Sequence, residues 1–103
     1  MMKKILLICN EGMSTGFLCN KMNDYAQQQG LDIHAWAIPE SALEGQYREA
    51  DIVLLGPQIG YLKESVCKRV QETLPVSVIS PIDFGRINAQ AVVEQALALI
   101  NEK

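Results

Sequence analysis

Residues 5–16 read ILLICNEGMSTG, an unbroken apolar run that passes directly into a loop rich in glycine and hydroxyl residues. The same design returns at residues 51–58, DIVLLGPQ, and in shorter form at residues 76–79, VSVI. Continuous apolar runs between turn signals are typical of parallel strands that are covered on both faces. Residues 32–38 alternate instead, and this pattern predicts an edge strand with one face less completely covered.

Amphipathic stretches between these runs predict helices. One helix is expected from about Ser14 to just before Gly30, since hydroxyl residues favour helix starts and glycine favours helix ends. A second apolar stripe at spacings of three and four runs through residues 59–70. A shorter helix is expected within residues 39–48, and Asn88 can cap a last helix near the end of the chain.

The order of these elements, four strands each followed by a helix, predicts a three-layer α/β/α fold with a four-stranded parallel sheet. With the edge strand second, the order 2-1-3-4 is favoured, as in flavodoxin-like folds. Ligands in such sheets sit at the carboxyl ends of the strands, where the chain reverses direction across the sheet. Cys9 ends the first strand and residues 56–58 follow the third, so we expect both at this point.

Length and composition limit the possible classes of protein. The 103 residues predict a single domain over residues 1–103, and fractions of 49% hydrophobic and 20% charged residues are those of a soluble globular protein. A net charge of −3 argues against a nucleic-acid-binding surface. The apolar run at residues 5–9 is too short for a signal-peptide core or a membrane span. The sequence therefore predicts a cytoplasmic protein.

The three cysteines, Cys9, Cys19 and Cys67, form neither a C-x-x-C pair nor an even-numbered framework. His34 alone could complete a metal cluster, so neither a disulfide framework nor a zinc site is predicted. No other metal and no organic cofactor is implied by the sequence. Cys19 falls at core spacing on the first helix and is expected to be buried, whereas Cys67 is expected to be half exposed. His34 is predicted to be structural or solvated with no partner nearby, and Trp36 to serve packing.

Residues 9–16, CNEGMSTG, have the composition of an anion-binding loop. Glycines let the backbone curl so that successive N–H groups face inward, and a following helix N-terminus adds partial positive charge. Such a nest favours a Cys9 thiolate and equally a bound phosphate. The same residues also suit a cysteine that merely ends a buried strand, and both interpretations stay open on the residues alone. Neither the G-x-x-x-x-G-K-[ST] nor the G-x-G-x-x-G nucleotide motif is present.

Cys9 with residues 12–15, GMST, and residues 50–59, ADIVLLGPQI, resembles the IIB subunits of the bacterial sugar phosphotransferase system, in their lactose/cellobiose/chitobiose class. The resemblance covers essentially the whole chain. It implies that Cys9 accepts a phosphoryl group from a histidine of a IIA protein, forming a phosphocysteine. It also implies that Cys9 passes this group to a (di)saccharide bound by the membrane IIC protein. The expected phosphate-binding residues are Asn10, Glu11, Gly12, Met13, Ser14, Thr15 and Gly16.

A second family shares this loop geometry. Low-molecular-weight tyrosine phosphatases carry C-x5-R-[ST], which would place arginine at position 15 and a hydroxyl residue at position 16. This chain has Thr15 and Gly16, so the guanidinium that clamps the phosphoryl transition state is missing. We therefore expect a loop that holds phosphocysteine without hastening its hydrolysis. A cysteine phosphatase and a non-catalytic interaction domain remain the alternatives.

Three further positions are expected around the site. Glu11 departs from the small neutral residues that follow the cysteine in cellobiose-type members. Its side chain is expected to point to solvent while its N–H joins the nest, so that its charge tunes the encounter with partners. Tyr61 follows the turn at residues 56–58 and is a candidate for the face that meets a partner protein. Residues 80–85 lie at the carboxyl end of the fourth strand and are a candidate for the rim of the site.

Overall fold

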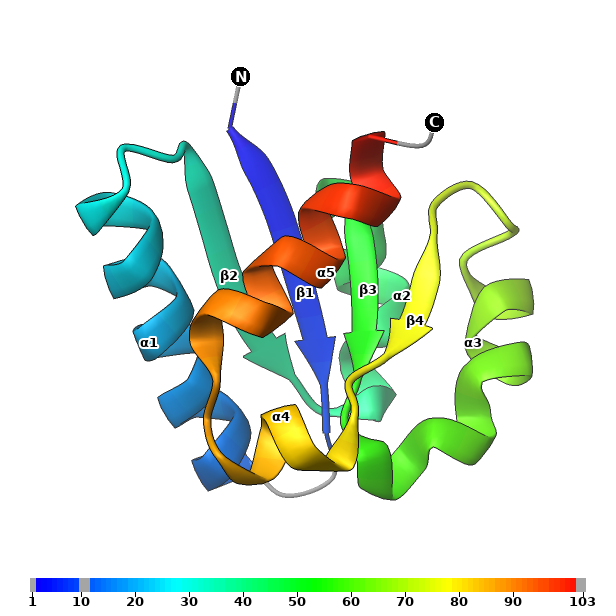
Figure 1. Cartoon of the computed structure of the whole chain (residues 1–103). Coiled ribbons are helices and arrows are strands. Elements are labelled where there is room, and N and C mark those ends of the chain that lie inside the picture. Colours follow the sequence, from blue (N-terminus) through cyan, green and yellow to red (C-terminus); the bar gives the residue numbers. More distant parts are fainter. Residues whose placement is uncertain (1, 10–11, 102–103) are drawn as a thin grey trace.

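Four parallel strands form the centre of the structure, a computed structural model that describes residues 2–9 and 12–101. They lie in the order β2-β1-β3-β4 (Figure 1), and every pairing between them is parallel. The strands are β1 (Lys3–Ile8), β2 (Ile33–Ile38), β3 (Ile52–Leu55) and β4 (Val76–Val78). The predicted four-stranded sheet and its order, 2-1-3-4, are therefore confirmed, and β2 is the predicted edge strand.

Helices cover both faces of this sheet and make the predicted three layers (Figure 1). The α-helices are α1 (Gly12–Gln28), α2 (Leu43–Gln46), α3 (Lys63–Arg69), α4 (Pro81–Gly85) and α5 (Ala89–Asn101), and the 3₁₀ segments are Glu40–Ala42, Tyr47–Glu49 and Pro57–Leu62. Helices α1, α4 and α5 pack on one face, and α2, α3 and buried residues of the last two 3₁₀ segments pack on the other. Among the described residues, no helix has both the length and the apolarity needed to cross a bilayer.

The apolar run of β1 supplies both cores. Ile5 and Leu7 belong to the apolar cluster beneath α1 and α5, whereas Leu6 and Ile8 belong to the cluster beneath α2 and α3. Successive residues of a strand point to opposite faces of the sheet, and helices cover both faces. All four side chains are therefore fully buried. A central strand covered on both faces therefore has to be apolar at every position, which explains the unbroken run.

The last helix was predicted with its cap. The Asn88 Oδ1 atom accepts a hydrogen bond from the Ala91 N–H at 3.2 Å, and α5 begins at Ala89. Val92, Val93 and Ala96 are buried on its inner face. The helix therefore starts where its N-cap satisfies one of the free N–H groups of the first turn.

Two helices differ from the prediction. The stripe at residues 59–70 was predicted as one helix, but it divides into the 3₁₀ segment Pro57–Leu62 and the shorter helix α3, with a kink at Ile59 (φ −118°, ψ 22°). Within that segment, a Cβ atom on Gly60 would lie 3.1 Å from Val78 Cγ1, so the backbone passes close to β4 there. Helix α1 begins at Gly12, earlier than the predicted Ser14.

Helix α4 was not predicted. Residues 80–85 were expected only as a segment at the rim, yet they contain a capped helical turn with Pro81 at its start. The Ser80 hydroxyl accepts a hydrogen bond from the Asp83 N–H at 3.1 Å, and Phe84 is buried in the core. One short turn carries too little periodicity to be detected as a helix in the sequence.

Substituting Gln71 by glycine is expected to raise the free energy of unfolding by about 0.5–1 kcal/mol, measured by urea denaturation. Gln71 and Glu72 follow α3 with φ values of 57° and 55°, a left-handed conformation that costs free energy for residues with a Cβ atom. The matched Gln71→Ala variant keeps a Cβ atom and should remain close to the wild type. A loss of stability in Gln71→Gly would contradict this account.

Candidate functional site

The site lies where the chain leaves the two central strands in opposite directions. After β1 the chain continues into α1 on one face of the sheet, and after β3 it continues into the segment Pro57–Leu62 on the other (Figure 1). The Cys9 N–H donates to the Ile38 carbonyl oxygen at 3.4 Å, and the Gly56 N–H donates to the Ile8 carbonyl oxygen at 3.1 Å. These bonds place Cys9 between the ends of β2 and β3, as the predicted topology requires.

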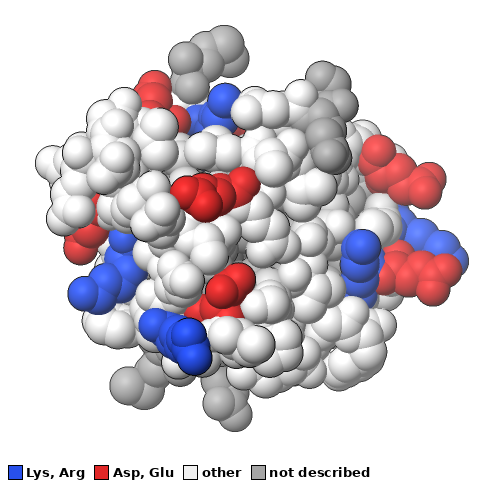
Figure 2. All heavy atoms as spheres, in the orientation of Figure 1, with Lys and Arg blue, Asp and Glu red and all other residues white. Residues whose placement is uncertain are grey.

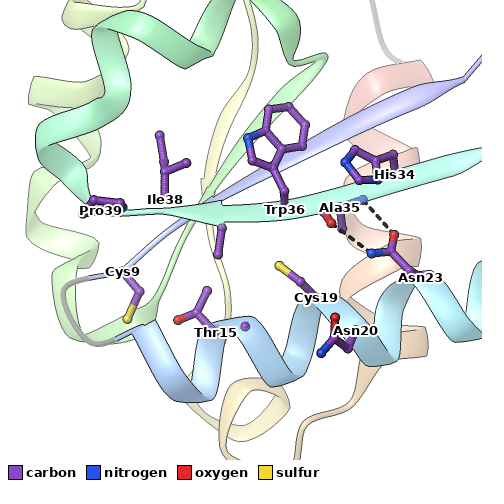
Figure 3. A pocket seen from close by; sticks show the side chains of 12 residues that line it. Cys9, Thr15, Cys19, Asn20, Asn23, His34, Ala35, Trp36, Ile38 and Pro39 are labelled. Atoms are coloured by element: carbon purple, nitrogen blue, oxygen red, sulfur yellow. Dashed lines mark hydrogen bonds between the residues drawn. The ribbon is translucent and has the colours of Figure 1, made fainter.

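Cys9 is largely buried, with 7% of its surface exposed. It lies at one end of a cavity of about 450 Å³ between α1 and the edge strand β2 (Figure 3). The cavity is lined by Cys9, Thr15, Gly16, Cys19, Asn20, Asn23, His34, Ala35, Trp36, Ala37, Ile38 and Pro39. The thiol therefore has free space beside it although little of its surface is exposed.

Thr15 lies in the same cavity, and its hydroxyl is turned to the end where Cys9 lies (Figure 3). The residue is 1% exposed, and its Oγ1 atom has no hydrogen-bond partner among the described residues. A buried hydroxyl without a partner costs about 1–3 kcal/mol, and native proteins usually keep such groups paired. With respect to the described residues, the Thr15 hydroxyl is therefore available to donate a hydrogen bond to a polar group in the cavity.

The predicted phosphate-binding residues are described only in part. Residues 12–16 form the start of α1, so the amino end of this helix lies at the same edge of the sheet as Cys9 (Figure 1). Thr15 and Gly16 line the cavity. Asn10 and Glu11, including the expected outward direction of the Glu11 side chain, lie outside the described residues. The amino end of a long helix supplies free N–H groups and partial positive charge.

The other cysteines do not share the setting of Cys9. Cys19 is buried on α1, as predicted, and burial raises the pKa of its thiol to about 12. A thiol that stays protonated at neutral pH is a poor nucleophile. Cys67 on α3 is half buried, also as predicted.

His34 has a partner, so the prediction that it stands alone is wrong. Its ring stacks on that of Trp36, with 5.5 Å between the ring centroids and 14° between the planes. Residues i and i+2 of a strand share a face, which brings the two rings together. The Trp36 indole N–H also donates to Gln46 Oε1 at 3.3 Å, in agreement with the packing role predicted for Trp36.

Asn23 makes a pair of hydrogen bonds that was not predicted. Its side-chain oxygen accepts from the Ala35 N–H at 2.8 Å, and its side-chain nitrogen donates to the Ala35 carbonyl oxygen at 3.0 Å (Figure 3). Asn23 therefore fixes α1 to the outer edge of β2 and sets one wall of the cavity. Within the part of the chain that the structure describes, no three His, Cys, Asp or Glu side chains gather in a way that could hold a metal ion.

Comparisons with known proteins agree with this geometry. Residues 4–95 match the family model of the lactose/cellobiose-specific IIB subunit of the phosphotransferase system (PTS). The chain is 41% identical over 100 residues to the oligo-β-mannoside-specific EIIB component of Bacillus subtilis (strain 168), covering 96% of this chain and 97% of the relative. It is 31% identical over 105 residues to the galactose-specific EIIB component of Lactococcus lactis subsp. cremoris (strain MG1363), covering the same shares.

A solved structure gives the same result. The cellobiose-specific phosphotransferase IIB component of Borrelia burgdorferi superimposes with a TM-score of 0.84 at 31% identity, covering 100% of this chain and 95% of that one. Fold, sequence and family model thus agree on one assignment, and they disfavour the phosphatase and the non-catalytic alternatives. The chain belongs to the lactose/cellobiose-specific IIB subunits of the sugar phosphotransferase system, a family of phosphoryl-transfer components in sugar uptake.

Proposed function

We propose that Cys9 carries the phosphoryl group as a phosphocysteine, taken from a histidine of a IIA protein and given to a sugar bound by a membrane IIC protein. In the first step, the Cys9 thiolate forms the S–P bond while the N–P bond breaks and its electron pair returns to the histidine nitrogen. In the second step, a sugar hydroxyl oxygen forms an O–P bond, and the S–P electron pair returns to Cys9. The hydroxyl proton passes to a base on the acceptor side.

The observation that carries this proposal is the buried Thr15 hydroxyl in the cavity of Cys9, which has no hydrogen-bond partner among the residues that the structure describes. A phosphoryl oxygen would accept its hydrogen bond and remove the cost of leaving it unpaired. We assign the remaining donors to the backbone N–H groups of residues 10–16, with help from the Ser14 hydroxyl. Transfer would then rest on positioning and electrostatics, as in phosphoryl transfer generally, without metal or organic cofactor.

The absence of arginine from the loop favours a carrier over a phosphatase. Position 15 holds a neutral threonine, which binds a phosphoryl group without adding a full positive charge to its transition state. Such a loop keeps the phosphoryl group on sulfur long enough for the acceptor to arrive. Residues 1–103 would act as one IIB domain that works at the inner face of the membrane through IIC.

The surface around the site suits partner proteins. Phe17, Tyr61 and Ile82 are 52%, 79% and 67% exposed, and each follows the carboxyl end of a different strand. On the face seen in Figure 2, charged groups of both signs are scattered between uncharged areas. Exposed apolar side chains around a reactive centre favour contact with a protein surface. Donor and acceptor need the same thiol, so they would dock in turn.

Ile82→Glu is expected to slow phosphoryl transfer from the IIA donor about 10-fold, because a carboxylate would be desolvated against the partner. The measurement is the rate of label arriving on Cys9 at several donor concentrations. Leu31→Glu is the matched control, since Leu31 is 37% exposed and follows α1, at the end of that helix away from the site. Equal rates for Ile82→Glu and Leu31→Glu would argue against a docking role for α4.

The proposed function is tested by incubating the protein with a phosphorylated IIA protein and mapping the added group by mass spectrometry. We expect label on Cys9 that persists alone and moves to sugar only when a IIC protein is added. Rapid release of free phosphate from small phosphoesters would indicate the phosphatase. Absence of label would indicate a non-catalytic domain. The relatives are named for oligo-β-mannoside, galactose and cellobiose, so each assay needs several sugars that include these three.

A further inference from the structure

Gln58 follows β3 on the opposite face of the sheet from α1, and its side-chain oxygen and the Cys9 sulfur both lie near Gly56. A Cβ atom placed on Gly56 would lie 3.0 Å from Gln58 Oε1 and 3.5 Å from Cys9 Sγ. The Gln58 carboxamide and the thiol thus border the same small space above Gly56. Because Gly56 has no Cβ atom, both groups can lie this near to its backbone.

The backbone that holds this arrangement is fixed. The Gly56 N–H donates to the Ile8 carbonyl oxygen at 3.1 Å, and the Gly56 carbonyl oxygen accepts from the Ile59 N–H at 3.1 Å. The Gln58 side chain is exposed and carries none of the hydrogen bonds found among the described residues. Its carboxamide is therefore free to turn and offer its N–H₂ group to a ligand on the sulfur.

We propose that Gln58 contacts the phosphoryl group carried by Cys9 and holds it from the side opposite to the amino end of α1. This inference rests on the proposed function, since it assigns a further ligand to the same phosphocysteine. Donors on two sides would fix the direction of the S–P bond toward the incoming acceptor. Proximity and orientation of this kind lower the barrier of group transfer.

The chemistry of an amide suits a carrier. A carboxamide offers two N–H donors and no net charge, whereas an arginine fork adds positive charge that stabilises the transition state of hydrolysis. Gln58 would thus hold the phosphoryl group in place without drawing water into the reaction. The position of the Gln58 side chain depends on the lack of a Cβ atom at Gly56, since such an atom would lie 3.0 Å from Gln58 Oε1.

Gln58→Ala is the first test. With phosphorylated IIA protein as donor, we expect the fraction of Cys9 phosphorylated at equilibrium to fall about 10-fold, the effect of one lost hydrogen bond to a charged group. Thermal unfolding should be unchanged because the side chain is exposed. Gln29→Ala, at the far end of α1, is the matched control and should label like the wild type.

Gly56→Ala is a second and independent test. The added methyl group would contact Cys9 Sγ at an ordinary 3.5 Å but would come within 3.0 Å of Gln58 Oε1, so the flexible Gln58 side chain must move away. We expect Gly56→Ala to reproduce the effect of Gln58→Ala. Adding Gly56→Ala to Gln58→Ala should then change labelling little, because both substitutions remove one interaction.

Gln58→Glu distinguishes contact with the phosphoryl group from a purely structural role of the Gln58 side chain. At pH 7.5 the glutamate carboxylate would face a dianionic phosphoryl group, so Gln58→Glu should lower labelling further than Gln58→Ala does. If the role of Gln58 were merely structural, glutamate would be the milder change, because it matches glutamine in size and alanine does not. Wild-type labelling in Gln58→Ala, additive effects in the double variant, or better labelling in Gln58→Glu than in Gln58→Ala would overturn this assignment alone. Absence of label from wild-type Cys9 would overturn the proposed function together with it.

Discussion

Cys9→Ser is expected to lower phosphoryl transfer to the sugar by at least about 1,000-fold, the usual scale for loss of a covalent nucleophile. A serine hydroxyl stays protonated at neutral pH and is a far weaker nucleophile than a thiolate. The substitution is small, and Cys9 is 7% exposed, so the fold should survive. The measurement is sugar phosphate formed per minute with phosphorylated IIA protein, a IIC protein in vesicles and the variant.

Cys67→Ser is the matched control for this experiment. Cys67 is a free, half-buried cysteine on α3, away from the cavity of Cys9. Its substitution should leave transfer unchanged, and the phosphoryl label should stay on Cys9. Transfer by Cys9→Ser at the wild-type rate, or label mapped to Cys19 or Cys67, would refute the role proposed for Cys9.

Thr15→Val should change stability and phosphoryl transfer in opposite directions. Removing a buried hydroxyl that has no partner in residues 2–9 and 12–101 should raise the free energy of unfolding of the unphosphorylated protein by about 1 kcal/mol. The phosphorylated fraction of Cys9 should fall about 10-fold, because the hydroxyl no longer donates to the phosphoryl group. Urea denaturation and mass spectrometry of the labelled protein measure the two effects separately.

Thr15→Ser is expected to have the opposite effects on stability and on labelling. It keeps the hydroxyl and loses a buried methyl group, so labelling should stay near wild type while the free energy of unfolding falls by about 1 kcal/mol. If Thr15→Val labelled as well as Thr15→Ser, the buried hydroxyl would have no part in holding the phosphoryl group. A fall in stability in Thr15→Val would mean that the hydroxyl is already paired in the free protein.

The strands and their order could be predicted because they depend on local pattern. The run at residues 5–9 is apolar at every position since β1 is buried on both faces, and the alternation near residues 32–38 marks β2 as the edge. The position of Cys9 at the switch point then follows from the order of the strands alone. Of the site, the sequence could thus predict the place of the thiol, whereas the phosphate-binding role of Thr15 and Gly16, which line the cavity from the first turns of α1, stays a prediction.

The remaining features depend on contacts between distant residues. The pairing of Asn23 with Ala35, and the placement of Gln58 and Cys9 beside Gly56, depend on how two elements lie against each other. The kink at Ile59 depends in the same way on β4, which passes close to Gly60. Helical periodicity indicates which face of one element is buried, and it carries no information on the contacts between that element and another.

The hydrogen bonds of Asn23 also affect how the protein aggregates at high concentration. The open edge of a parallel sheet presents backbone donors and acceptors on which a strand from a second molecule can add, the first step of ordered aggregation. The Asn23 carboxamide already occupies the N–H and C=O groups of Ala35 in the middle of β2. An incoming strand would have to break both bonds and displace α1 before it could pair with β2, so one amide side chain hinders strand addition at this edge of the sheet.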